Sequence, residues 1–111
     1  MNITLDKEQI NLIAVALEQS HDTFPMLFTK IMDAHNSINW GQTTSLPLDN
    51  GELHDIVHFL LREKNYWRKH ADKHINVGTK EELRYANLLL DQVERLGYLA
   101  DTLKNSMENI Q

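Results

Sequence analysis

The six histidines are the residues of this sequence with the clearest capacity for chemistry. Two residues four positions apart on a helix share one side of it, and a histidine pair at that spacing can hold zinc or iron. The sequence contains two such pairs, His54 with His58 and His70 with His74. It also contains two acid–histidine pairs at the Glu-x-x-His spacing of di-iron bundles, Glu18 with His21 and Asp55 with His58. A helical bundle that binds metal through histidines and carboxylates is therefore one hypothesis.

Helix geometry argues against a metal ion shared by these histidines. The two histidine pairs are sixteen residues apart on one expected helix, so they point about 160° apart and lie more than about 20 Å apart along its axis. The first pair also lies opposite the apolar side that carries Leu53 and Leu60. Hemerythrin-like bundles place their ligands inside, on several helices, and this pattern departs from them. We expect solvated surface histidines, with no metal ligand and no cofactor.

The acidic pairs do not predict an enzyme either. Glu52-x-x-Asp55 and Asp91-x-x-Glu94 are similar to the magnesium-binding pairs of all-α nucleotide pyrophosphohydrolases. That chemistry needs more carboxylates directed at one ion, and the expected Glu-Glu-x-x-Glu run is missing. The sequence has no glycine-rich phosphate loop and no nucleophile beside a positioned base. We expect a protein without enzymatic activity and without catalytic residues.

A basic and aromatic stretch at residues 62–70 is the strongest candidate for binding. On a helical wheel, one exposed face gathers five residues, His58, Arg62, Tyr66, Lys69 and Lys73. We call these five residues the basic stripe. It could contact an acidic protein surface or a phosphate backbone, although a merely solvated helix face is the common alternative. Trp67 falls on the apolar side of the same helix, where it is expected to pack rather than stack on bases.

Trp40 lies beside Gly41, outside any helical stripe. A tryptophan in such a loop either caps the end of a bundle or anchors a partner. We count it with the basic stripe as a candidate partner-binding residue.

The elements that position these residues are expected to be four helices. The apolar spacing predicts helices at about residues 6–20, 24–38, 50–76 and 80–109, with a loop at 39–49. Three capping pairs mark helix starts: Asp6 with Gln9, Asp49 with Glu52, and Thr79 with Glu82. Pro25 favours a first turn, and Gly78 ends the third helix. The fold class is therefore all-α, with two short N-terminal helices packed on a long antiparallel helical hairpin.

The last helix carries a heptad pattern with a wide apolar arc. One heptad position contains Ala86, Val93, Ala100 and Met107, and the other contains Leu89, Leu96, Leu103 and Ile110. Leu83, Tyr85, Leu88, Leu90 and Leu99 widen this arc to more than half the circumference. A helix with so wide an arc is expected to touch two neighbours and to form the centre of the fold.

The lengths of the helices do not match. The two long helices should each run roughly 40 Å at about 1.5 Å per residue, and the first two helices only about half that. The short helices could lie end to end along the hairpin or side by side over one half of it. The second arrangement leaves apolar surface bare, and a homodimer through the third and fourth helices is then the simplest cover, by symmetry.

The composition indicates in which cellular compartment this domain is expected to work. The chain has 111 residues, enough for one domain with a core, and no cysteine. It shows neither a signal-peptide pattern nor an apolar run of membrane-spanning length, so we expect a cytoplasmic protein that does not enter a membrane. The net charge of −5 argues against nucleic acid as partner, although residues 51–79 carry four acidic and five basic groups.

These observations predict a single helical domain, residues 1–111, that acts by binding a protein. The expected role is that of a small regulator, inhibitor or adaptor, and the composition suggests a bacterial, phage or mobile-element accessory protein. A nucleic-acid-associated protein that uses the basic face of the third helix is an alternative, as is the metal-binding bundle.

Overall fold

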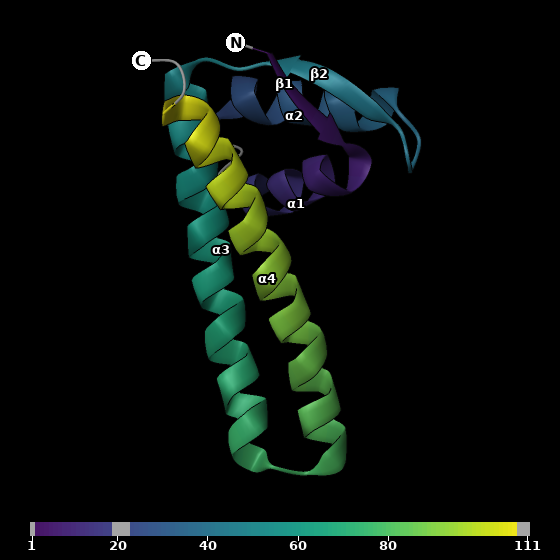
Figure 1. Ribbon diagram of the computed structural model, residues 1–111, viewed down its shortest axis with the longest axis vertical. Helices are drawn as coiled ribbons and strands as arrows, with labels where there is room; N and C mark the ends of the chain where they lie inside the picture. The colour runs from purple at the N-terminus through teal and green to yellow at the C-terminus, as the bar shows by residue number, and fades with distance from the viewer. Residues whose placement is uncertain (1, 19–22, 109–111) are drawn as a thin grey trace.

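The computed structural model describes residues 2–18 and 23–108, except for the side chain of residue 108, and contains four helices and one small sheet over those residues. The helices are α1 (Lys7–Leu17), α2 (Pro25–Ser37), α3 (Asn50–Val77) and α4 (Lys80–Glu108), and the strands are β1 (Asn2–Asp6) and β2 (Thr43–Pro47). The predicted hairpin of two long antiparallel helices with two short helices is confirmed (Figure 1). The predicted ends at residues 19–20 and 109 lie outside the described residues.

The predicted helix starts are confirmed at atomic detail. Asp6 and Asp49 each accept a hydrogen bond from the backbone three residues on, and Gln9 and Glu52 return the bond to the cap. The Thr79 hydroxyl accepts a bond from the Glu82 backbone N–H at 3.2 Å. The Glu82 carboxylate contacts His74 of α3 instead of closing the box. These caps supply partners for backbone N–H groups that a helix end leaves without one.

The loop predicted at 39–49 is wrong over five of its residues. Thr43–Pro47 pairs antiparallel with Asn2–Asp6, and Ile3 lies opposite Leu46 in the register. Both of these side chains are buried, together with Leu5. The strands close the end of the core that the short helices leave open, because their apolar residues belong to the same buried cluster. The chain is mostly helical with a small two-stranded sheet.

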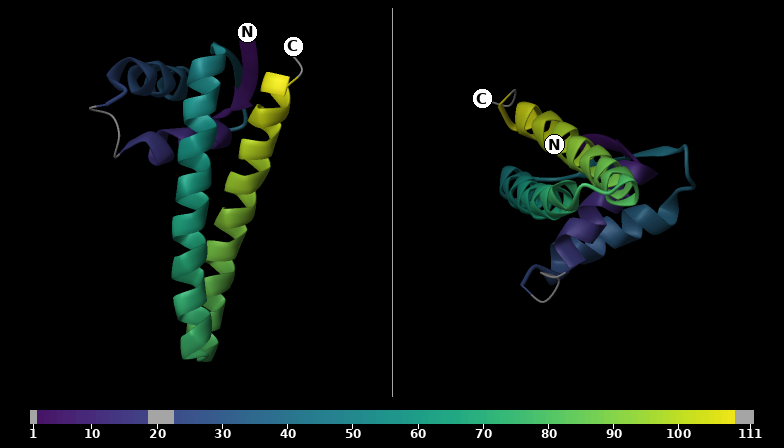
Figure 2. Two further views of the ribbon diagram at one scale, coloured as in Figure 1. Left: turned by 90° about the vertical axis from the view of Figure 1, so that its left-hand side faces the viewer. Right: turned by 90° about the horizontal axis from the view of Figure 1, so that it is seen from below.

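The short helices lie side by side over one end of the hairpin. α1 packs on both α2 and α3, and Figures 1 and 2 show α1, α2 and the sheet gathered at the end where α3 begins and α4 ends. We call α1, α2, β1 and β2 the head. The other end of the hairpin, residues 64–77 and 80–93, projects beyond the head, and we call it the distal half.

The heptad pattern predicted α4 as the central helix, and this prediction is wrong. The central helix is α3. α3 packs on α4 along its length and also on α1. Near the head, the buried residues of α3 face both α1 and α4. α4 instead leaves apolar residues such as Leu88 exposed to solvent. The heptad itself is confirmed over the described residues, since Leu89, Leu96 and Leu103 are buried. Its last predicted member, Ile110, lies outside the described residues.

The core lies between the head and the adjoining half of the hairpin. In α3, five of the first eleven residues are buried: Leu53, Ile56, Val57, Phe59 and Leu60. In the rest of this described helix, Ala71 is the only buried residue. In α4 the core includes Leu96, Leu99, Ala100 and Leu103. The distal half is therefore held mainly by contacts between α3 and α4. None of the helices in the described part of the chain is long and apolar enough to cross a lipid bilayer.

Candidate protein-interaction surface

The basic stripe lies on the exposed face of α3. All five of its side chains are exposed, Tyr66 at 58%. Four of them, His58, Arg62, Tyr66 and Lys69, line a shallow depression of about 410 Å³ together with Leu61 and Asn65. These residues are spaced three or four apart, so they share the face of α3 that points away from α4. The structure thus gathers the stripe into one continuous surface.

The aromatic residue of the stripe is fixed by its neighbours. The ring of Tyr66 stacks on that of His70, with centroids 6.0 Å apart and planes 9° apart. It also meets the edge of Trp67 at 5.3 Å, and Trp67 packs against the core, as predicted. Ring contacts of this kind restrict side-chain motion, so Tyr66 presents a positioned apolar face between basic groups.

The stripe is a cationic surface with unpaired charges. Residues 62–77 contain five basic and two acidic residues. Among the residues that the structure describes, Arg62, Lys69 and Lys73 form no salt bridge, whereas Arg95 of α4 pairs with Glu8 and Asp91. Cations left without an internal partner remain available to an anionic surface.

Trp40 lies on another part of the molecule. It is 64% exposed, its ring meets the edge of His35 at 6.2 Å, and the Lys7 ammonium lies 5.5 Å from its centroid. Trp40 follows the end of α2, whereas Phe24, just before α2 begins, contacts Phe59 of α3 at 5.7 Å. A helix of 13 residues separates them, about 20 Å. Trp40 and the stripe therefore do not form one compact site.

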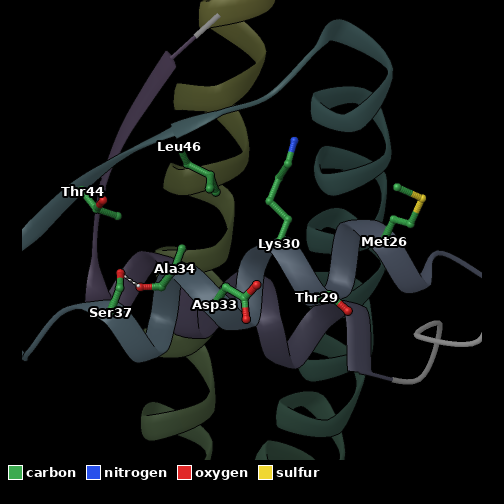
Figure 3. Close-up of a pocket in the computed structure, with 8 residues that line it drawn as sticks. All are labelled: Met26, Thr29, Lys30, Asp33, Ala34, Ser37, Thr44 and Leu46. Carbon is green, nitrogen blue, oxygen red and sulfur yellow. Dashed lines mark hydrogen bonds between the residues drawn. The ribbon is translucent and has the colours of Figure 1, made fainter.

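A hollow between α2 and β2 was not foreseen from the sequence (Figure 3). Its lining includes Lys30 and Ser37 of α2 and Leu46 of β2. The Lys30 ammonium donates to the Pro47 carbonyl at 2.7 Å and pairs with Glu52 at 3.1 Å, and the Ser37 hydroxyl donates to the Ala34 carbonyl at 2.8 Å. Lys30 thus holds α2 to β2 and to α3, and Ser37 bonds within α2, so neither of these two polar groups is free in the hollow.

Four of the six histidines lie along α3, and His35 lies in α2. His54 and His58 are exposed. His70 and His74 are half-buried, with rings 5.2 Å apart, and His74 contacts Glu82 and Tyr85 of α4. Over residues 2–18 and 23–108, no three histidine, aspartate or glutamate side chains are grouped so that they could hold a metal ion. Of the Glu18 and His21 pair, His21 lies outside the described residues.

Members of the acidic pairs serve structural contacts. Glu52 caps α3 and pairs with Lys30, and Asp91 lies 3.1 Å from the Arg95 guanidinium. Ion pairs of this kind occupy the carboxylate oxygens that would bind magnesium. This arrangement gives no support to the magnesium chemistry considered for these spacings.

The distal half exposes apolar residues that the heptad analysis counted as widening the buried arc. Leu83, Tyr85, Leu88 and Leu90 are exposed, while Leu99, beside the head, is buried. The expectation for these four residues is thus wrong within one copy of the chain. The reason is the placement of the head, because the α4 residues that join its core, Leu96, Leu99, Ala100 and Leu103, all lie beyond the distal half. The amphipathic pattern shows which residues could be buried, but not which of them the head reaches.

Comparison with known protein families, with curated proteins and with solved structures finds no match for this chain.

Proposed function

We propose that this protein is a non-enzymatic interaction module that binds an acidic surface of a partner protein through the basic stripe. The observation that supports it best is the position of the stripe: a positioned tyrosine among cations that form no salt bridge with any described residue, on a helix that projects beyond the folded head. Tyrosine and arginine are the residue types that most often dominate protein interfaces. Opposite charge on the partner would steer its approach.

The proposed role is that of a small regulator, inhibitor or adaptor that occludes or bridges its partner. The head contributes nearly half of the buried apolar residues of the described chain and would keep its fold when the outer face of the hairpin is engaged. The hairpin would then act as a rigid arm, because both of its helices are continuous over nearly thirty residues.

A protein partner is favoured over nucleic acid by the surroundings of the stripe. Glu63 and Asp72 interrupt its basic sequence, and residues 80–101 of the adjoining helix contain five acidic and three basic residues. Binding to a phosphate backbone needs an extended positive surface, whereas a short positive surface is sufficient to bind an acidic patch on a protein. Nucleic-acid binding is the alternative that a salt-dependent binding measurement would reveal.

A charge-reversal experiment tests this proposal. The doubly substituted chain Arg62→Glu with Lys69→Glu should recover at least about tenfold less of a stoichiometric partner than the unaltered chain, in affinity capture from the cells that produce it. The loss is expected because two attractive contacts become repulsive. Circular dichroism should show unchanged helix content, since both side chains are exposed.

The matched control is Arg84→Glu with Lys104→Glu, which changes the net charge equally on exposed residues of α4. Partner recovery by this variant should stay within about twofold of that by the unaltered chain. Equal losses in both variants, or no loss in either, would contradict the assignment of the stripe. Binding of a labelled DNA duplex or single-stranded RNA that weakens steeply between 50 and 200 mM salt would replace it with the nucleic-acid alternative.

A further inference from the structure

A groove runs along the side of the hairpin opposite to the head. Its walls are cationic on α3, with Lys64 and Arg68, and anionic on α4, with Glu94 and Asp101, and its apolar surface includes Leu90 and Tyr98. The groove encloses about 410 Å³. It is separate from the basic stripe, which lies on the outer face of α3.

A glycine shapes the floor of this groove. A Cβ at Gly97 would lie 3.3 Å from the Lys64 ammonium nitrogen and 3.4 Å from its Cε. The missing side chain lets the aliphatic part of Lys64 lie across α4, while its charge stays at the edge of the groove. An apolar floor with a charge at each edge results.

Exposed apolar residues extend the groove toward both ends of the hairpin. Leu61 precedes Lys64 by three residues, and Ile75 follows Arg68 by seven, so helical spacing places them on the same side of α3. Leu83 precedes Leu90 by seven residues on α4. All of these are at least one-third exposed, although a contiguous apolar surface on a monomer is normally small.

The charges of the groove complement those of a second copy. A twofold axis parallel to the hairpin would place the cationic α3 wall of one copy against the anionic α4 wall of the other, in both directions at once. A twofold axis across the hairpin would instead oppose like charges. The short helices of the head do not obstruct the parallel axis, because Figure 2 shows α1 and α2 on the other side of the hairpin.

The available area is sufficient for a stable dimer. Each long helix runs about 40 Å, and two adjacent helices present a face about 20 Å wide. This gives roughly 800 Å² for each copy, the size of a standard protein interface.

We propose that a second copy of this chain occupies the groove, so that two hairpins form a four-helix bundle about an axis parallel to their helices, with both basic stripes left exposed. The charged walls of the dimer interface are residues other than the five of the basic stripe, although Leu61 borders both surfaces. The two proposals can therefore fail independently.

Two complementary variants test the dimer. Lys64→Glu with Arg68→Glu makes both walls of the groove acidic, and Glu94→Lys with Asp101→Lys makes both walls basic. At about 50 µM, sedimentation equilibrium should give the unaltered chain about twice its mass of 12.9 kDa, each variant alone the single mass, and their equimolar mixture the double mass again. The mixture recovers the dimer because every opposed pair of walls then carries opposite charge.

Three results would overturn the proposal: a monomeric unaltered chain, variants that remain dimeric alone, or a mixture that stays monomeric although circular dichroism shows both variants folded. The stripe variant Arg62→Glu with Lys69→Glu is the control and should remain dimeric.

Discussion

Replacement of Leu60 by alanine is expected to lower the free energy of unfolding by about 2–5 kcal/mol, because it leaves a cavity where a leucine side chain packs. Leu60 is fully buried and belongs to the core between the head and the hairpin. Urea unfolding followed by circular dichroism, at one protein concentration for all variants, measures this loss.

The matched control is Leu88→Ala on the distal half. Leu88 is 66% exposed, so its truncation should change the free energy of unfolding by no more than about 0.5 kcal/mol. Equal losses at the two positions would mean that the division between a buried head end and an uncovered distal half is incorrect.

Proline at Ala71 should have the second large effect, a loss of at least about 3 kcal/mol in the free energy of unfolding. Ala71 is buried in the middle of the distal part of α3, where proline would remove a backbone hydrogen bond and clash with the carbonyl four residues earlier. The thermal midpoint and the helix content from circular dichroism report the change.

Asn50→Pro is the matched control, because it also introduces a proline into α3. Asn50 is the first residue of α3, where an N–H needs no helical partner, and Asp49 before it has the extended backbone that proline requires, with φ −85° and ψ 172°. Its cost should stay below about 1 kcal/mol. If Ala71→Pro proves as mild as Asn50→Pro, α3 is not a continuous helix through residue 71.

Helices were predictable from this sequence because their signals are local. Capping pairs such as Asp49 with Glu52 lie within four residues, and the heptad of α4 repeats over its whole length. The predicted ends of α3 and the structural ends agree to within one residue. The exposed positions of the basic stripe followed from the same periodicity.

The sheet was missed because its signal is not local. Residues 2–6 alternate between exposed and buried, but five residues are too few to distinguish a strand from the approach to a helix. The partner strand, Thr43–Pro47, buries only Leu46. The pairing of segments some forty residues apart creates the buried face, and neither segment encodes it alone.

The groove could not be predicted for a related reason. Its residues, such as Leu90 and Tyr98, follow ordinary helical spacing. Whether they are covered depends on the side of the hairpin that the head occupies. The mismatch in helix lengths predicted a bare surface under one arrangement, and the structure selects that arrangement and places the surface.

Site-specific photo-crosslinking tests the central claim, that a partner protein docks on the outer face of α3, most directly. A benzophenone amino acid at Tyr66, introduced in the cells that produce this protein, is predicted to yield one discrete adduct with a different protein. That adduct should disappear when Arg62 and Lys69 are changed to glutamate, and a probe at Asp33, exposed on α2, should not form it. The absence of any adduct at Tyr66, or the same adduct from both positions, would contradict the account.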